Sequence, residues 1–390
     1  MKRISILGST GSIGRQCLKV VDSLPSKFEV VGIAAGNNVE LAAEQTAKYR
    51  PKVVGVATCE GAKQLRERLT AAKVQPMPEV LCGAEGMERV ATHPDVDTVL
   101  SAAVGVVGLP ATYKAVQLGK NLALANKEVL VAAGELVMAE AERQHKAVLP
   151  VDSEHNAIHQ CLRAGEKSEV KRLVLTASGG PFRKTPVSEL ANVTPAQALA
   201  HPNWKMGKRI TTDSATLMNK GFEVIEAGWL FGMRADQIEV VIHPQSTIHS
   251  MVEFVDGSIL AQLGPTDMRM PIQYALTYPE RVASNGFALD WSSLKSLDFE
   301  PVPAGKFPCL TLAMQAMQQG GALPCALNAA DEESVAAFLD GRLGFTEIAQ
   351  VIEQVLARMP RAAFRTMDDV LAADREARRM AREEIEKRKN

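Results

Sequence analysis

The 390-residue sequence has no hydrophobic run long enough to cross a bilayer and no excess of charge of either sign. A membrane-spanning helix needs about 20 apolar residues in succession, so no membrane partner is expected. The formal net charge of −1 offers no basic surface for nucleic acid. Hydrophobic residues make up 46% of the chain, which suits a globular protein of two or three packed domains.

Closely paired cysteines are also missing, which argues against a zinc site. Scattered cysteines are typical of a reducing compartment. The first β-rich run begins almost at Met1, so no signal or transit peptide is expected before it. We therefore predict a cytoplasmic location. All six cysteines are expected to fill the core, at Cys17, Cys59, Cys82, Cys161, Cys309 and Cys325.

A glycine-rich segment near the N-terminus predicts a dinucleotide site. Residues 3–7 form a β-rich run, and residues 8–14, with the spacing G-x-x-G-x-x-G, then open a helical pattern. Glycines at such a turn let the backbone approach a pyrophosphate, whose charge is stabilised by free amides at the helix N-terminus. Strand-like and helical runs alternate up to residue 151, as in a doubly wound parallel sheet. A Rossmann-like domain is therefore expected over residues 1–150.

The second strand-like run ends without an acidic residue, in Gly36-Asn37-Asn38. An NAD site usually places Asp or Glu there to hold the ribose hydroxyls, so the absence favours NADP. No Arg or Lys stands at these positions to bind a 2′-phosphate either.

Two short acidic segments predict a site for a hard cation. Asp152 and Glu154 follow the apolar run 147–151, and the two-residue period of a strand would put both carboxylates on one side. Helical spacing puts Asn219, Lys220 and Glu223 on one face. Oxygen ligands favour Mg²⁺ or Mn²⁺. The alternative is a solvated acid pair and a simple Lys–Glu salt bridge.

Two turns beyond residue 151 predict an anion site. Ser178 lies in a Ser-Gly-Gly-Pro turn after an apolar strand, and Ser214 follows Asp213, a candidate N-cap, at the expected start of a helix. Together they suggest a phosphate ester. Between them, residues 198–207 have the composition of a lid, in which Trp204 covers the substrate and His201 binds the phosphate; the alternative is an inward-packed loop.

Lys127 follows the apolar run 122–125, at the sheet edge where open α/β proteins bind ligands. It either reaches a substrate oxygen or pairs with Glu128 at the surface. Later runs at 240–242, 250–254 and 259–263 predict a second sheet, with a hairpin turn at Asp256-Gly257 and a surface suited to dimerisation. The expected fold is thus α/β: a Rossmann-like domain (1–150), a central α+β catalytic domain with a dimerising sheet (151–280), a connector (281–308) and a C-terminal helical bundle (309–390).

Six segments, in order along nearly the whole chain, resemble the 1-deoxy-D-xylulose 5-phosphate reductoisomerase family. The resemblance implies NADPH-dependent rearrangement and reduction of 1-deoxy-D-xylulose 5-phosphate to 2-C-methyl-D-erythritol 4-phosphate, in isoprenoid precursor biosynthesis, by a homodimer. The segments are residues 8–14, 125–128, 151–155, 178–182, 201–207 and 213–223.

The resemblance also implies the site. Mg²⁺ or Mn²⁺, with Co²⁺ as a further candidate, would bind Asp152, Glu154 and Glu223. The substrate phosphate would contact Ser178, His201, Ser214 and Asn219, while Lys127, Ser153 and Lys220 contact the hydroxyl-bearing carbons and Trp204 closes over the substrate. The catalytic set would be Lys127, Asp152, Glu154 and Glu223. The NADPH site would be lined by Thr10, Gly11, Ser12, Ile13, Gly36, Asn37, Asn38, Asn126, Glu128 and Gly207.

One departure concerns Asn37, where members of this family often carry a basic residue; it puts the discrimination against NADH in doubt. Two alternatives remain open. One is a dehydrogenase of the aspartate-semialdehyde or homoserine type, which has no place for three metal-binding carboxylates. The other is a non-catalytic NADP-binding regulator, which needs neither metal nor phosphate ester, so that metal-dependent substrate binding would discriminate against it.

Overall fold

The computed structural model describes residues 1–201, 206–283, 286–292 and 294–388. The chain separates into two compact units, each assembled from stretches that are distant in sequence. Unit 1 contains Met1–Val129, Val137–Asn156 and Asp267–Phe287. Unit 2 contains Leu130–Leu136, Ala157–Thr266 and Ala288–Asn390. Among the described residues, no helix combines the length and apolar character needed to span a membrane.

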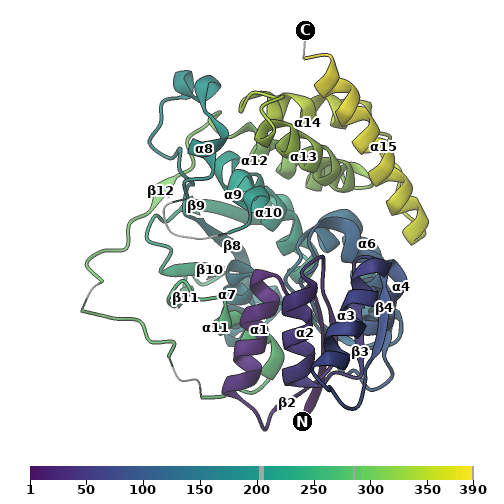
Figure 1. Cartoon of the computed structure of the whole chain (residues 1–390). Coiled ribbons are helices and arrows are strands. Elements are labelled where there is room, and N and C mark those ends of the chain that lie inside the picture. The colour runs from purple at the N-terminus through teal and green to yellow at the C-terminus, as the bar shows by residue number, and fades with distance from the viewer. Residues whose placement is uncertain (202–205, 284–285, 293, 389–390) are drawn as a thin grey trace. The chain divides into compact units, whose positions relative to one another are not determined.

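Unit 1 is built on a seven-stranded parallel sheet, as the alternating pattern predicted (Figure 1). Its strand order is β4-β3-β2-β1-β5-β6-β7. The strands are β1 (Lys2–Leu7), β2 (Phe28–Ala34), β3 (Val53–Val56), β4 (Glu79–Cys82), β5 (Thr98–Ser101), β6 (Asn121–Leu124) and β7 (Val148–Pro150). Crossover helices link them, namely α1 (Ser12–Ser23), α2 (Val39–Tyr49), α3 (Cys59–Ala71), α4 (Gly83–Thr92), α5 (Leu109–Gln117) and α6 (Glu128–Arg143).

The core of unit 1 is completed by a helix from far along the chain, α11 (Arg269–Thr277). Ile272 and Leu276 of this helix are fully buried in the same cluster as Ile4 and Ile6 of β1. The Lys2 ammonium also donates a 2.6 Å hydrogen bond to the carbonyl oxygen of Leu276. Helix α11 therefore belongs to the core of unit 1, although no local pattern in the sequence indicates that a helix beyond residue 266 returns to it.

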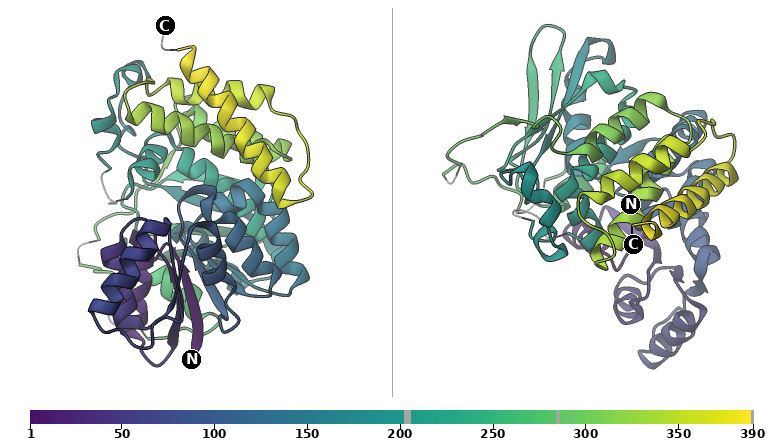
Figure 2. Two further views of the ribbon diagram at one scale, coloured as in Figure 1. Left: turned by 45° about the vertical axis from the view of Figure 1, so that its right-hand side comes forward. Right: turned by 90° about the horizontal axis from the view of Figure 1, so that it is seen from above.

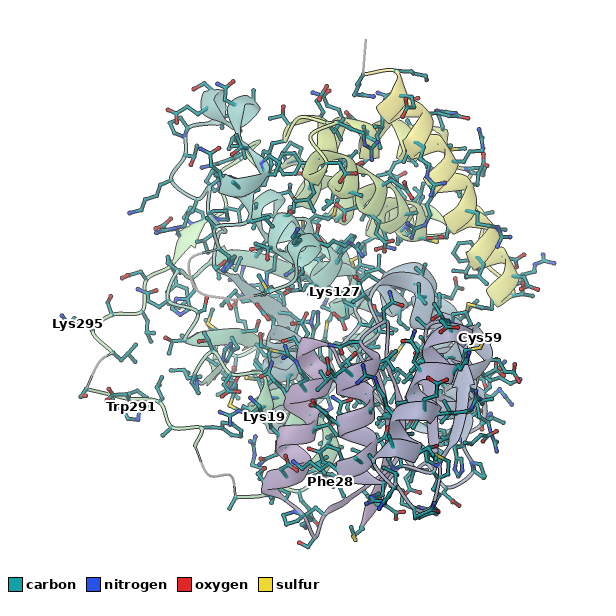
Figure 3. All side chains as sticks on the ribbon, viewed as in Figure 1. Lys19, Phe28, Cys59, Lys127, Trp291 and Lys295 are labelled. Atoms are coloured by element: carbon teal, nitrogen blue, oxygen red, sulfur yellow. A yellow bond between two sulfur atoms is a disulfide. The ribbon has the colours of Figure 1, made fainter. Side chains whose placement is uncertain are left out.

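The prediction that all six cysteines fill the core is wrong for two of them. Cys59 and Cys82 form a disulfide, with their Cα atoms 5.0 Å apart, and Cys59 is exposed at the start of α3 (Figure 3). Strands β3 and β4 are parallel neighbours, with Val56 opposite Cys82, so the two cysteines meet at the strands' common end. The two cysteines are 23 residues apart in the sequence. Their spacing therefore did not predict the disulfide, because only the pairing of β3 with β4 brings them together. The other four cysteines are buried thiols.

Unit 2 contains a mixed five-stranded sheet with the order β11-β10-β8-β9-β12. Strand β8 pairs antiparallel with β10 and parallel with β9. The predicted hairpin is confirmed: the Asp256 carboxylate accepts a bond from the amide of Ser258, and Gly257 has φ 87°. The predicted connector contributes the last strand of the sheet. The strands are β8 (Val170–Ala177), β9 (Ile238–Ile242), β10 (Ile248–Phe254), β11 (Ile259–Leu263) and β12 (Glu300–Pro301).

Helices and irregular segments make up the rest of unit 2, which includes the predicted C-terminal bundle (Figure 2). The longest helix but one begins at Leu323, and Pro324 occupies its first turn, where the missing amide costs no hydrogen bond. The helices are α7 (Ser153–Cys161), α8 (Pro195–Ala198), α9 (Lys208–Thr216), α10 (Met218–Phe231), α12 (Pro308–Gln319), α13 (Leu323–Leu339), α14 (Glu347–Arg358) and α15 (Met367–Glu386), the first of which begins in unit 1.

Candidate functional site

The glycine-rich turn joins β1 to α1 at the carboxyl edge of the parallel sheet. The amides of Gly8 and Ser9 both donate 2.8 Å bonds to the Ala34 carbonyl at the end of β2. Gly11 is the N-cap of α1 and has no side chain to occupy the first amides of the helix. A Cβ at Gly14 would lie 2.3 Å from the Gly8 oxygen, so only glycine permits this turn. The predicted residues Thr10–Ile13 thus lie where a helix N-terminus favours a pyrophosphate.

The end of β2 lies beside this turn because β1 and β2 are neighbours. Gly36, Asn37 and Asn38 are all exposed. The Asn38 side chain caps α2 by accepting a 3.0 Å bond from the Leu41 amide. The segment 36–38 that follows β2 therefore presents amide side chains and no carboxylate.

The segment after β6 is held by Asn126, whose side chain is buried. Its amide nitrogen donates to the carbonyl oxygens of Ala103 and Gly105, the latter at 2.7 Å, and its side-chain oxygen accepts from the Glu128 amide. Asn126 thereby fixes the backbone on either side of Lys127.

Lys127 lies next to Asp152 in the structure. The ammonium nitrogen lies 2.5 Å from Oδ2 of Asp152, and the two side chains are only 7% and 16% exposed. The sequence could not reveal this pair, since the residues meet only because β6 and β7 are parallel neighbours. Lys127 and Asp152 therefore form a largely buried ion pair at the carboxyl edge of the sheet.

The carboxylates of Asp152 and Glu154 lie within 4.8 Å of each other, as expected, but the strand geometry expected to bring them together is wrong. Strand β7 ends at Pro150, and Ser153 and Glu154 lie in the first turn of α7. The Ser153 hydroxyl donates a 2.5 Å bond to the Glu154 carboxylate, and Nδ1 of the buried His155 lies 3.9 Å from Asp152. The apolar run did not show where the strand stops, because Val151 is buried without being part of it.

In unit 2, the turn after β8 brings together residues predicted to bind phosphate. The Ser178 hydroxyl oxygen lies 3.1 Å from Nε2 of His201 and accepts a 3.2 Å bond from the Gly180 amide. Burial lowers the pKa of His201, so this imidazole is neutral at pH 7. A Cβ at Gly180, whose φ is 64°, would lie 2.6 Å from the carbonyl oxygen of Ser214. The two predicted anion-binding segments are therefore packed together.

Ser214 does not begin a helix, which corrects the sequence prediction. It lies in the last turn of α9, whose N-cap is Gly207, another predicted site residue. Leu217, in the left-handed conformation at φ 58°, then separates α9 from α10. Asp213 resembles an N-cap in sequence, but the helix around it begins five residues earlier. The helix N-terminus available to an anion in this region is that of α10, where Asn219 is the second residue.

The predicted polar face of α10 is confirmed. The Asn219 side-chain amide donates a 2.7 Å bond to one oxygen of Glu223, and the Lys220 ammonium donates a short bond to the other. Lys220 is 3% and Glu223 0% exposed. Burying such a pair costs desolvation energy that can exceed the mutual attraction, so the pair is weak evidence for a stabilising role.

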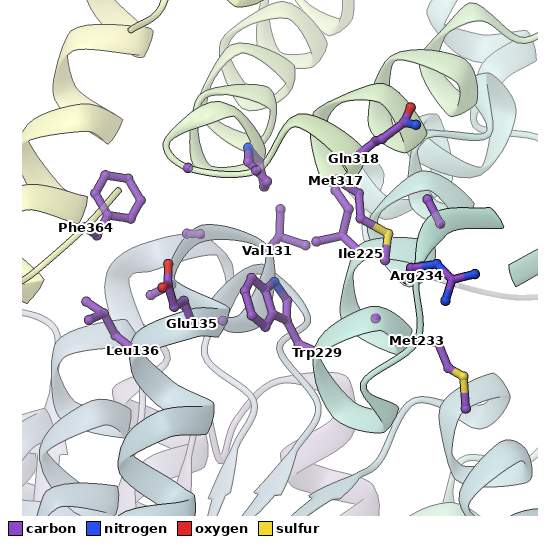
Figure 4. Close-up of a pocket in the computed structure, with 18 of the residues that line it drawn as sticks. Val131, Glu135, Leu136, Ile225, Trp229, Met233, Arg234, Met317, Gln318 and Phe364 are labelled. Carbon is purple, nitrogen blue, oxygen red and sulfur yellow. The ribbon is translucent and has the colours of Figure 1, made fainter. Parts of the chain in front are cut away.

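The predicted metal ligands occur in both units, with Asp152 and Glu154 in unit 1 and Glu223 in unit 2. Trp204 lies outside the described residues. Unit 2 also contains a cavity of about 600 Å³ lined by Trp229, Met233 and Met317 among others (Figure 4). Of the described residues predicted for the site, none lines this cavity.

Comparisons with known proteins agree over the whole chain. Three family models match: 1-deoxy-D-xylulose 5-phosphate reductoisomerase over residues 4–134, its C-terminal domain over 148–231, and a DXP reductoisomerase C-terminal domain over 263–380. A reductoisomerase of Solibacter usitatus is 53% identical over 385 residues, covering 98% of this chain and 97% of that protein. One of Caldanaerobacter subterraneus is 53% identical over 379 residues, covering 97% and 98%.

Solved structures of the same enzyme share the fold. The Zymomonas mobilis reductoisomerase in complex with NADPH is 41% identical with a TM-score of 0.92, covering 99% of each chain. A reductoisomerase in complex with NADPH, fosmidomycin and magnesium is 38% identical with a TM-score of 0.92, covering 99% of this chain and 98% of that one.

Proposed function

Because this chain belongs to the 1-deoxy-D-xylulose 5-phosphate reductoisomerase family, we propose that it converts 1-deoxy-D-xylulose 5-phosphate to 2-C-methyl-D-erythritol 4-phosphate with NADPH and a divalent metal. The observation that carries the proposal is the Asn219–Lys220–Glu223 cluster, a buried carboxylate held by an amide and an ammonium one helical turn away. A simple dehydrogenase and a nucleotide-binding regulator have no use for such a cluster, because neither needs a buried carboxylate beside a phosphate site.

The glycine turn of unit 1 fits NADPH. Its helix N-terminus has a glycine N-cap, and a Cβ at Gly8 would lie 2.5 Å from the Ala102 oxygen, so only glycine lets this turn pack against the segment that follows β5. The edge at Gly36–Asn38 carries no carboxylate to repel a 2′-phosphate. Asn126, Glu128 and Gly207 complete the proposed nucleotide contacts.

The carboxylates of Asp152, Glu154 and Glu223 fit Mg²⁺ or Mn²⁺, with Co²⁺ as a further candidate, because all three offer oxygen ligands only. In the structure Asp152 and Glu223 each hold an ammonium, that of Lys127 and that of Lys220. These lysines offset part of the negative charge of the two carboxylates. When bound, NADPH supplies a hydride and the metal ion acts as a Lewis acid toward the substrate oxygens.

The protein's own residues hold and orient the substrate. Ser178, Ser214 and Asn219 are proposed to donate hydrogen bonds to the substrate phosphate. His201, whose pKa is lowered by burial, lies within hydrogen-bond distance of the Ser178 hydroxyl. Lys127, Ser153 and Lys220 are proposed to contact the hydroxyl-bearing carbons. An anchored phosphate keeps the rearranged aldehyde in place for reduction, because positioning lowers the entropic part of the barrier.

An assay of nicotinamide absorbance tests this function. Purified protein is mixed with 1-deoxy-D-xylulose 5-phosphate, NADPH and Mn²⁺, then with chelator, and then with NADH in place of NADPH. We expect oxidation that requires both metal and substrate and yields the branched polyol phosphate. Oxidation that survives chelation would favour a simple dehydrogenase, and NADPH binding without any oxidation would favour a regulator. The ratio of NADPH to NADH rates measures how far Asn37 limits discrimination.

We also propose a homodimer that uses the edge strand β11. Val255 and Ile259 are 64% and 53% exposed, and Leu260 is 39% exposed. An apolar sheet edge of this kind promotes aggregation unless another surface covers it, and a second copy of the same strand would cover it symmetrically.

The dimer proposal predicts that Ile259→Glu separates the protomers. Light scattering should give a mass near 42.0 kDa for the variant and twice that value for the natural protein, because a buried charge at a symmetric interface occurs twice. Val187→Glu is the control, since Val187 is 60% exposed and belongs to a short helical turn that is not part of the sheet, so the substitution should leave the mass unchanged. A monomeric natural protein would exclude the dimer, and a dimeric Ile259→Glu variant would exclude this edge.

We also propose domain boundaries near residues 150, 280 and 308 and a cytoplasmic location. The four buried thiols are compatible with a reducing compartment, whereas a structural disulfide such as Cys59–Cys82 is unusual there. Labelling of thiols in freshly lysed cells would show whether Cys59 and Cys82 are oxidised to the disulfide or reduced to free thiols.

A further inference from the structure

The first turn of α9 is tied to the C-terminal helices through Arg209. Its guanidinium group bonds to the Glu332 carboxylate at 2.7 Å and to the Asn328 side-chain oxygen at 2.8 Å, and it lies 3.4 Å from the Asp331 carboxylate. All three partners lie on α13. Arg209 also lies 3.6 Å from the carboxylate of Asp213, on its own helix.

These contacts are largely shielded from water. Asn328 and Asp331 are 0% exposed, and the side chains of Arg209 and Glu332 are 19% and 18% exposed. Polar groups buried in this way hold a defined geometry, because any displacement leaves a charge without its partners. The Arg209 network, as we call Arg209 with Asn328, Asp331 and Glu332, is therefore a rigid attachment of α9.

The network extends to the last helix of the chain. The second oxygen of Glu332 accepts a 2.6 Å bond from Arg378 of α15, which also bonds to Asp374 at 2.8 Å. Glu332 is thus shared between α9 and α15. The C-terminal helices hold the start of α9 through a continuous set of charge-assisted bonds, which are roughly twice as strong as neutral ones.

Helix α9 begins near Arg209 and carries a proposed phosphate ligand, Ser214, near its C-terminal end. Ser214 follows Asp213 and lies five residues after Arg209, about 7.5 Å along the helix axis. Ser214 also packs against the Gly180 turn beside Ser178. Because a helix of this length moves as one body, a shift of its first turn is transmitted to the Ser214 hydroxyl.

We infer that Arg209, held by Glu332 on α13, is a positioning residue that sets Ser214 for recognition of the substrate phosphate. This inference rests on the proposed function, since it takes Ser214 as a phosphate ligand. It gives the C-terminal helices a role in substrate selection, although they supply none of the residues proposed to contact the substrate.

The test compares Glu332→Gln with Glu333→Gln. Both residues lie on α13 and both contact Arg378, but the main partner of Glu333 is Arg382 of α15, at 2.7 Å. The quantity measured is the ratio of kcat/KM for 1-deoxy-D-xylulose 5-phosphate to that for unphosphorylated 1-deoxy-D-xylulose, with inorganic phosphate absent. A loss of general stability lowers both values, whereas a displaced phosphate ligand lowers only the first.

We expect Glu332→Gln to reduce this ratio about tenfold through KM, because a lost charge-assisted bond is worth about that factor. NADPH affinity and kcat should change less than about twofold, and Glu333→Gln should match the natural protein. Arg209→Lys keeps the charge but loses the fork that reaches Asn328, so we expect a smaller reduction; it replaces Glu332→Gln in the comparison if that variant does not fold.

Ser214→Ala separates the two levels of the argument. If it lowers the ratio while neither Glu332→Gln nor Arg209→Lys does, the Arg209 network has no positioning role and the inference is overturned. If Ser214→Ala also leaves the ratio unchanged, the proposed phosphate site itself is wrong.

Discussion

Glu223→Gln is expected to lower kcat by about 100- to 1,000-fold, the usual effect of losing one group that stabilises charge in a transition state. Glutamine matches the shape of glutamate and retains one side-chain oxygen, which can accept the bond from Lys220 or from Asn219 but not both, because these bonds go to different oxygens of Glu223. It removes the negative charge that a divalent cation needs from a ligand. The fold and NADPH affinity should stay nearly unchanged, since the glycine turn belongs to a different unit.

The measurement is kcat at saturating substrate over a series of Mn²⁺ concentrations. Glu253→Gln is the matched control: Glu253 is a little-exposed carboxylate of β10 in the same unit, bonded to Lys171 and Arg172, and outside the proposed site. It should keep natural turnover even if it lowers stability. Near-normal turnover of Glu223→Gln at saturating metal would remove Glu223 from the metal role.

Gly14→Ala is expected to weaken NADPH binding by more than about 100-fold, or to destabilise unit 1 by about 3 kcal/mol, the upper range for overpacking a close contact. The added methyl group would lie 2.3 Å from the Gly8 oxygen and 2.5 Å from the Ser9 Cα. Both atoms are backbone, so relief requires the turn itself to move. The movement would displace the amides proposed to hold the pyrophosphate.

Urea unfolding and an NADPH fluorescence titration together measure this effect. Gly36→Ala is the control for the unfolding measurement alone, because Gly36 belongs to the proposed nucleotide site. A Cβ at Gly36 meets no atom within 4 Å, so this variant should leave the free energy of unfolding nearly unchanged. A Gly14→Ala protein that folds and binds NADPH like the natural one would show that the turn is not the nucleotide site.

The sequence predicted features that depend on neighbours within one element. The period of α10 placed Asn219, Lys220 and Glu223 on one face, and the glycine spacing located the turn between β1 and α1. Both predictions follow from local geometry, because the spacing of residues along the sequence determines which side chains share a face of one helix or turn. The parallel sheet followed from alternation of the same local patterns along the chain.

The sequence failed where two elements distant in the chain meet. Asp152 pairs with Lys127, and Cys59 with Cys82, because parallel strands end side by side. Spacing in the sequence carries no trace of that proximity. Element ends were the other weakness: strand β7 stops before Asp152, and Ser214 ends a helix where it was expected to begin one. Helix ends depend on capping and packing together.

The return of α11 to the core of unit 1 has a consequence during protein synthesis. Unit 1 includes residues 267–287, and Ile272 and Leu276 fill space beside β1. The first 129 residues therefore emerge from the ribosome with part of their core still unmade. Until residue 287 has followed, this nascent portion exposes apolar surface that α11 will later cover, which is the condition under which chaperones bind growing chains. The nucleotide-binding unit begins at the N-terminus but is completed only after nearly three quarters of the chain has been made.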